Sequence, residues 1–438
     1  MKKAIFLVDD IKNGKVITFL ESLYSKLIDK LESEDTCLMW LHEIGKLLYN
    51  HPSDFIKFVS VKDFMNLNTM PADRDVFYFV SCRHNLDLLS IDHFLGMDPV
   101  VSDFLVRNNI PIILDTSMEI VNHHTGSYRL LDSNSHFLSN TKWFRGIHNL
   151  KFYIVGSTHR AFSDQRPRHI QSLLSVFPGP FFQYNFKGSE LNKRLIVEKN
   201  QILDNAFNKK IDESTLTWQA YSSNPRVNRS LFQMKVEHEN LVDGVGIYSR
   251  LIPGTEEYVS DSIKLELYLD ADRMPFANKD QIKKLNNIKL IDNKVGGVTS
   301  IADSNFLFSV VLETFCPEER HDFTNSISFL TEKTAMAIFS GVPFIPLGGH
   351  NIGNILKSYG FREYPGLEFP TQPHFLDELD YVVDKIRTIH VMSVKEKQDL
   401  YDSWKPTIEY NFNRYMNIDI KKVYLETLHK SIVAGPQW

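Results

Sequence analysis

The apolar positions of the first half of the chain alternate between short continuous runs and longer helical repeats. Short apolar runs that end on polar or acidic residues are typical of strands buried on both faces of a parallel sheet. Apolar residues at helical spacing predict helices over Val16–Leu31 and Thr36–Tyr49. Strands alternating with helices predict a parallel α/β sheet over residues 1 to about 190. The predicted strands are Ala4–Val8, Asp75–Ser81, Ile110–Leu114 and Phe152–Val155.

The second half repeats the pattern. A helix is predicted over Leu231–Leu241, and the tail Lys395–Ile432 is mostly helical. Glu190–Glu213 is charged and lacks Gly and Pro, which fits either a helix or a connector. The predicted strands are Thr215–Ser222, Lys264–Leu269 and Phe306–Leu312.

The stretch from Ser326 to Phe361 has the most explicit local signals. Ser328 or Thr331 can cap a helix, and Gly341 can end it in the left-handed conformation. An apolar strand at Val342–Leu347, a Gly-Gly turn and a second helix follow. With the preceding strand, this stretch predicts a strand, loop, helix, strand and helix, which is half of a doubly wound domain.

Polar residues of this stretch fall where open α/β sheets bind ligands. Glu313 follows the end of a predicted strand, and Glu332 and Lys333 open the next helix. A helix N-terminus with a lysine suits a diphosphate, and a carboxylate there can accept both hydroxyls of a ribose. The alternative is that Glu332 is only an acid of the first helical turn and Lys333 a solvated charge.

These residues also carry a family resemblance. VVLET followed by FLTEKTAMAIFSGVPFIPLG resembles the donor-site signature of GT-B glycosyltransferases of the α1,3-fucosyltransferase type. The stretch is also similar to phage and bacterial proteins that carry an N-P-R-x-x-R segment about a hundred residues earlier, here Asn224–Arg229. The resemblance extends over Tyr221–Phe361, about a third of the chain.

The resemblance implies an α/β GT-B fold, in which two Rossmann-like doubly wound domains face each other across a cleft. It predicts an acceptor-binding domain over residues 1–213, a donor-binding domain over 214–394 and a helical tail over 395–438 that packs back on the first domain. The implied reaction moves a sugar from a nucleotide sugar to an acceptor hydroxyl, with inversion and no bound metal or other cofactor. The implied donor-binding residues are Arg226, Arg229, Glu313, Glu332 and Lys333.

An inverting transferase also needs a base for the acceptor hydroxyl. Asp115 or Glu119, after a predicted strand, is the first candidate, and Asp9, Asp10 and Asp87 are rivals near other strand ends. All of these can equally be solvated loop acids. A loop after the fourth predicted strand could hold a phosphate-bearing acceptor, although it could equally be solvated. Its cations are Arg160, Arg166 and Arg168.

Other interpretations stay open. The acceptor could be a glycan, a lipid-linked sugar or a hydroxymethylated base in phage DNA. Asp270 and Asp272 form a D-x-D triplet after a predicted strand, the arrangement with which GT-A transferases hold a divalent ion. A second triplet, Asp73–Asp75, precedes its strand. A nucleotide-binding protein without catalysis is the third possibility. The histidine pairs lack a third metal ligand at useful spacing, so no structural zinc is expected.

Length and composition indicate the number of domains, the kinds of partner and the cellular compartment. With 438 residues the chain is long for one domain and natural for two. A formal charge of −5 argues against general nucleic-acid coating, though not against a local basic groove. Three scattered cysteines without metal spacing, Cys37, Cys82 and Cys316, favour a reducing, cytoplasmic compartment. No apolar run approaches the ~20 residues of a membrane helix, and the N-terminus predicts a strand, not a signal peptide.

Overall fold

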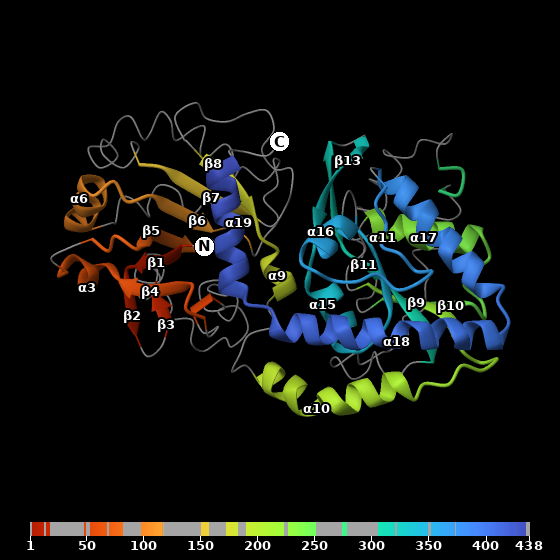
Figure 1. The fold of residues 1–438 in the computed structure, drawn as a ribbon. Coiled ribbons are helices and arrows are strands. Elements are labelled where there is room, and N and C mark those ends of the chain that lie inside the picture. Colours follow the sequence, from red (N-terminus) through yellow and green to blue (C-terminus); the bar gives the residue numbers. More distant parts are fainter. Residues whose placement is uncertain are drawn as a thin grey trace, which may run out of the picture. The chain divides into compact units, whose positions relative to one another are not determined.

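The computed structural model divides the chain into two compact units (Figure 1). Unit 1 is Met1–Ser189 together with Ile418–Trp438, and unit 2 is Glu190–Asn417. The structure describes residues 2–12, 15–17, 48–49, 53–67, 70–81, 98–115, 117, 150–156, 172–182, 190–222, 227–250, 274–277, 305–319, 322–348, 352–372 and 374–434.

Unit 1 is built on a six-stranded parallel sheet in the order β4-β1-β5-β6-β7-β8. Because β4 lies outside β1 while β5 to β8 follow on its other side, the topological switch point falls between β1 and β5. The strands are β1 (Lys3–Val8), β4 (Ile56–Ser60), β5 (Arg74–Ser81), β6 (Ile112–Asp115), β7 (Phe152–Gly156) and β8 (Ser172–Val176). A hairpin of β2 (Asp10–Lys12) and β3 (Lys15–Ile17) and the helices α3 (Val61–Met65), α6 (Pro99–Arg107) and α9 (Gly179–Phe182) complete its N-terminal part.

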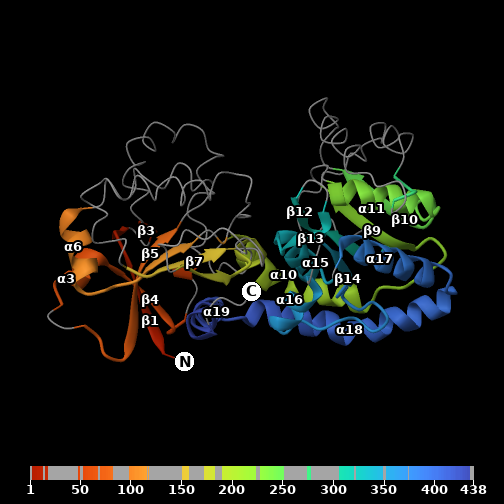
Figure 2. The same ribbon diagram turned by 90° about the horizontal axis from the view of Figure 1, so that it is seen from above.

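The last helix of the chain belongs to unit 1. Helix α19 (Ile420–Ala434) packs on β8 and β4, alongside the sheet in Figures 1 and 2. Its Tyr424 ring meets Phe6 of β1 edge-on, with ring centroids 6.0 Å apart, and Phe177 after β8, at 5.0 Å. Burying these aromatic rings anchors the C-terminal segment on a sheet made by the start of the chain. The predicted return of the tail to the N-terminal domain is therefore confirmed for α19.

Unit 2 contains a four-stranded parallel sheet in the order β10-β9-β11-β14. Right-handed crossovers that lead in opposite directions place their helices on opposite faces, so α11 and α15 cover different faces. The strands are β9 (Leu216–Ser222), β10 (Gly246–Arg250), β11 (Phe306–Leu312) and β14 (Phe344–Leu347). The helices are α10 (Glu190–Phe207), α11 (Val227–His238), α15 (Glu332–Phe339), α16 (Ile352–Ser358), α17 (Phe375–His390) and α18 (Val394–Asn417).

The boundary between the units differs from the prediction. Helix α10 packs along α18 in unit 2. Helix α18 in turn packs on α15, which covers the second sheet, so α10 and α18 both belong to unit 2. The Lys199 ammonium of α10 donates to the Asn413 side chain of α18 over 2.6 Å. Unit 2 therefore starts at Glu190 rather than at residue 214, and only the residues from Ile418 onward return to unit 1.

Two other local predictions differ from the structure. The predicted loop between β11 and α15 contains an antiparallel hairpin of β12 (Thr314–Glu319) and β13 (Asp322–Phe329). Val16 and Ile17, the predicted start of a helix, lie in β3, and residues 18–47 lie outside the described residues. The strand predicted at Lys264–Leu269 also lies outside them.

Together, the parallel sheets, their helices and the returning α19 confirm an α/β fold with two Rossmann-like units, as expected for a GT-B protein. Among the described residues, no helix is both long and apolar enough to cross a membrane.

Candidate functional site

The carboxyl ends of β9 and β11 mark the switch point of unit 2, because these neighbouring strands lead to helices on opposite faces. Residues just after β11 and at the starts of α11 and α15 therefore gather at one edge of the sheet. The sequence places its predicted donor-site residues in the same segments. Glu313, Glu332 and Lys333 are the predicted residues at the end of β11 and the start of α15.

Helix α15 begins at a well-formed cap. Thr331 has extended backbone angles, and its hydroxyl accepts a hydrogen bond from the Lys333 amide over 3.3 Å. Glu332 occupies the first turn, where the helix dipole favours a carboxylate. Gly341, with a φ of 63°, follows the end of the helix in the left-handed conformation. Of the two predicted caps, Thr331 is the cap and Ser328 lies in β13, and the predicted stop at Gly341 is confirmed.

Glu313 fixes this cap to the end of β11. One carboxylate oxygen accepts the Thr331 amide over 3.0 Å and the Thr334 hydroxyl over 2.6 Å. The other oxygen accepts the Thr331 hydroxyl. Glu313 is 0% exposed, so its carboxylate serves these donors rather than solvent. We call this set of contacts the Glu313 clamp.

The electrostatics of the clamp favour a cation beside it. Burial raises the pKa of the Glu313 carboxyl, while the Lys333 ammonium and the two threonine hydroxyls act in the opposite direction. A buried ionised carboxylate costs several kcal/mol unless donors or cations compensate it. Moving α15 away from β11 would remove the donors to Glu313, so the clamp holds α15 in one position relative to β11.

Lys333 and Glu332 are the partly exposed members of the group. The Lys333 ammonium lies 3.2 Å from the Thr331 hydroxyl and 3.2 Å from a Glu332 carboxylate oxygen. Their side chains are 20% and 34% exposed. A helix N-terminus with a solvent-accessible lysine can hold an anion such as a diphosphate.

The start of α11 is tied to the same place. The Asn228 side-chain amide donates to the backbone carbonyl of Glu313 over 2.9 Å. This bond joins the N-P-R-x-x-R segment to the end of β11. Arg229 is only 1% exposed, so its guanidinium lies in the interior of unit 2. Arg226 lies outside the described residues.

Gly348 permits the close packing at this edge. A Cβ atom at this position would lie 2.4 Å from the Glu313 Cβ, far inside normal contact. Glycine after β14 therefore lets the backbone approach the clamp directly.

Three polar residues of the site were not singled out by the sequence. They are Asn228 and Thr334, and the third is Thr331 in a role that was not predicted, as a donor to Glu313 as well as the cap. The spacing of Thr331 and Thr334, three residues apart on one helical turn, was the signal that could have indicated both.

The predicted acceptor residues belong to unit 1. Asp115 ends β6 and is 0% exposed. One carboxylate oxygen accepts the amide and the hydroxyl of Ser117, over 3.0 and 2.7 Å, and the other accepts the Tyr424 hydroxyl of α19. Burial raises the pKa of Asp115 to about 6, against the lowering effect of these hydrogen bonds.

Asp9 lies at the same edge of unit 1, directly after β1, where it accepts the Tyr78 hydroxyl over 2.7 Å. The structure thus brings two of the candidate bases to one sheet edge, two strands apart. The candidate base Asp10 begins β2. The remaining predicted acceptor residues lie outside the described residues: Asp87, Glu119, Arg160, Arg166 and Arg168. So do Asp270 and Asp272 of the D-x-D triplet.

Comparison with known proteins gives distant structural likenesses. The chain is similar to a UDP-forming trehalose-phosphate synthase from Burkholderia xenovorans, with 11% identity, a TM-score of 0.36, and coverage of 84% of this chain and 76% of that one. It is also similar to a trehalose-6-phosphate synthase with 9% identity, a TM-score of 0.33, and coverage of 84% and 75%. No family model matches the sequence. No curated protein matches it either.

Among the described residues, no group of three or more His, Cys, Asp or Glu side chains is placed to hold a metal ion. From the residues described at this edge of unit 2, a ligand would meet a helix N-terminus, the Lys333 ammonium and the Glu332 carboxylate. This combination is suited to a nucleoside diphosphate rather than to an apolar ligand.

Proposed function

We propose that the protein is a glycosyltransferase that moves a sugar from a nucleotide-sugar donor to an acceptor hydroxyl. The observation that carries this proposal is the Glu313 clamp, which fixes the start of α15 and Lys333 at the switch point of the second sheet. The resemblance of the same residues to the GT-B donor signature supports it.

Each residue of the site has a distinct proposed role. Lys333 and the first amides of α15 bind the donor diphosphate and stabilise the charge that develops as it leaves. Glu332, whose carboxylate is more exposed than that of Glu313, accepts hydrogen bonds from the ribose hydroxyls. Glu313 contributes indirectly, because both its oxygens already hold the cap of α15. By resemblance, we also propose Arg226 and Arg229 as ligands of the diphosphate. Arg229 is buried in unit 2, so it would have to reach the diphosphate from the protein interior.

Unit 1 supplies the proposed base. A carboxyl with a pKa of about 6 is largely ionised at neutral pH, which suits Asp115 to take a proton. An acceptor hydroxyl would have to replace Tyr424 or Ser117 as the donor to that carboxylate. By resemblance we propose transfer with inversion and without a divalent ion, to a glycan, a lipid-linked sugar or a hydroxymethylated DNA base.

The first test is a thermal-shift screen with UDP-, GDP-, ADP- and CMP-sugars, with and without magnesium. We expect one nucleotide class to stabilise the wild type by several degrees, through preferential binding to the folded state. The shift should be lost in Glu332→Ala and kept in the matched control Glu409→Ala, which removes an exposed acid of α18. A screen without any shift would contradict the proposal.

The second test measures release of the nucleoside diphosphate from that donor, with glycan or hydroxymethylated duplex DNA as acceptor. Turnover that depends on the acceptor supports a transferase and identifies the acceptor class. A donor that binds at the site but is never turned over would instead favour the nucleotide-binding protein without catalysis.

A further inference from the structure

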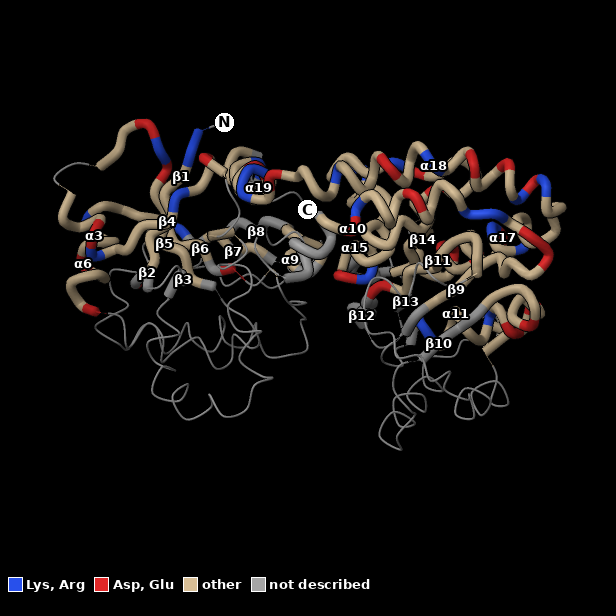
Figure 3. The backbone as a smooth tube through the Cα atoms, turned by 90° about the horizontal axis from the view of Figure 1, so that it is seen from below, with Lys and Arg blue, Asp and Glu red and all other residues tan. Residues whose placement is uncertain are grey.

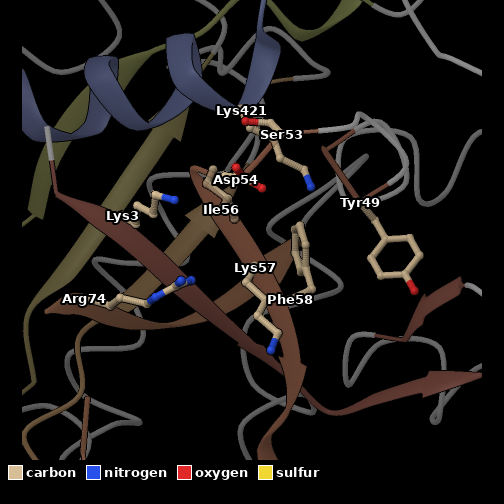
Figure 4. A pocket seen from close by; sticks show the side chains of 9 residues that line it. All are labelled: Lys3, Tyr49, Ser53, Asp54, Ile56, Lys57, Phe58, Arg74 and Lys421. Atoms are coloured by element: carbon tan, nitrogen blue, oxygen red, sulfur yellow. The ribbon is translucent and has the colours of Figure 1, made fainter. Parts of the chain in front are cut away.

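Unit 1 contains a cavity of about 550 Å³ at the edge of its sheet opposite to Asp9 and Asp115 (Figure 4). Lys3 opens β1, Ile56 opens β4 and Arg74 opens β5, so the cavity lies at the amino ends of three neighbouring parallel strands. The α19 side chain Lys421 forms another part of its lining. The cavity is separate from the clamp of unit 2 and from the candidate bases of unit 1.

The lining is strongly cationic. Lys3, Lys57, Arg74 and Lys421 contribute four positive charges, against the single carboxylate of Asp54. Figure 3 shows the blue Lys and Arg segments at the start of β1 and on α19. Arg74 is only 3.9 Å from Asp73, its neighbour in the chain. In the part of the chain that the structure describes, Lys3, Lys57 and Lys421 form no ion pair within 4.0 Å.

Lys421 is the least exposed of these cations, at 7%. Burial lowers the pKa of its ammonium, and the carboxylates of Asp419 and Asp54 oppose this effect from a distance. Asp419 is itself held by the Ser53 hydroxyl over 2.9 Å. No carboxylate of the described residues lies within 4.0 Å of the Lys421 ammonium, so an anion in the cavity would reduce the cost of burying it.

We propose that this cavity binds a small phosphorylated ligand, such as a phosphomonoester or a diphosphate. The four cations of the lining outnumber the lining carboxylate Asp54 and its neighbours Asp73 and Asp419, and this excess of positive charge favours an anionic ligand. The volume lies in the range of small-molecule sites, about 300–1,000 Å³. The neighbouring Tyr49 and Phe58 side chains give the ligand an apolar surface beside its phosphate.

Pyrophosphate titrated by calorimetry into the full-length protein tests the proposal. The experiment uses the Lys333→Ala background, so that a diphosphate site in unit 2 contributes little. In this background we expect pyrophosphate still to bind to the cavity of unit 1, with one site per chain. Adding Lys3→Gln and Lys57→Gln should weaken it at least about tenfold, since each removes a charged hydrogen-bond donor. The control Lys62→Gln, an exposed lysine on α3, should change affinity less than about twofold.

Arg74→Gln serves as a second variant, and circular dichroism checks that each variant is folded. Affinities of the cavity variants equal to that of Lys62→Gln would overturn the proposal. So would the absence of pyrophosphate binding in the Lys333→Ala background. Binding of a short DNA duplex but not of pyrophosphate would also overturn it, in favour of a surface for a nucleic-acid backbone.

Discussion

Each unit buries a carboxylate at the carboxyl end of a parallel strand, Glu313 in unit 2 and Asp115 in unit 1, but the two carboxylates accept hydrogen bonds from different segments. In unit 2, Glu313 holds the first turn of α15 through Thr331 and Thr334. In unit 1, Asp115 holds Ser117 and the Tyr424 hydroxyl of the returning helix α19. Both side chains are fully buried.

The difference lies in what remains accessible beside each carboxylate. Next to Glu313, the start of a helix presents Lys333 and Glu332 to solvent. Next to Asp115, the described neighbours Ser117 and Tyr424 are buried. A buried acid at a strand end can therefore either position a ligand site or anchor a distant segment. Which of the two it does depends on the groups that donate hydrogen bonds to it. Four predictions test this contrast.

The largest effect is expected for Glu313→Ala. Its removal leaves the Thr331 amide and two threonine hydroxyls without their acceptor in a buried setting. We expect a loss of about 4 kcal/mol in the free energy of unfolding, measured by urea denaturation. Glu409→Ala is the control for the loss of one acid. A loss below about 1 kcal/mol would mean that the clamp does not hold α15.

The second prediction is that Asp115 makes the free energy of unfolding depend on pH. Its pKa of about 6 in the folded protein exceeds the ordinary value of 3.8. Between these values the folded state binds more protons than the unfolded state, so stability falls as pH rises from about 4 to about 6 and is level above. The free energy of unfolding of wild type minus that of Asp115→Asn should therefore fall by about 2.5 kcal/mol between pH 4 and pH 7.

Urea denaturation at both pH values measures this difference, and Asp103→Asn, an exposed acid of α6, is the control. A difference that stays constant with pH would contradict the burial of an ionisable Asp115. If Asp115 is also the base, Asp115→Asn should abolish turnover while Tyr424→Phe leaves it largely intact. If it is only an anchor for α19, both variants should lower stability with small changes in turnover.

A smaller effect is expected for Gly348→Ala. The added methyl group would meet the Glu313 Cβ at 2.4 Å, so either the backbone after β14 or the clamp must shift. We expect a loss of about 2 kcal/mol, in the range of overpacked sites, together with weaker nucleotide binding. Gly244→Ala is a contrasting control: its φ is 70°, but no atom lies within 4 Å of the added methyl group. Similar nucleotide affinities for the two variants would show that the close approach at Gly348 is unimportant to the site.

The sequence predicted those features of the site that follow local rules. Thr331 as the cap, Gly341 as the stop and Glu313 at a strand end are each set by residue types within one turn or one strand. The α/β alternation was likewise visible, because buried parallel strands are continuously apolar.

What the sequence did not predict depends on distant partners. Helix α10 belongs to unit 2 because it packs on α18, some two hundred residues later in the chain. The burial of Asp115 depends on Tyr424, whose approach no local pattern encodes. The hairpin β12–β13 lies where the sequence predicts a loop between a strand and a helix, and its strands pair only with each other.

The central claim is that the start of α15 binds the donor nucleotide, and Lys333 tests it most directly. Lys333 is partly exposed and does not donate to Glu313 itself, so Lys333→Ala should keep the three hydrogen bonds of the clamp and fold, which circular dichroism checks. Calorimetric titration of the nucleotide found in the screen should give an affinity at least about tenfold weaker for Lys333→Ala than for wild type. Lys395→Ala, an exposed lysine at the start of α18, should bind like wild type. Equal affinities for wild type and Lys333→Ala would contradict the account.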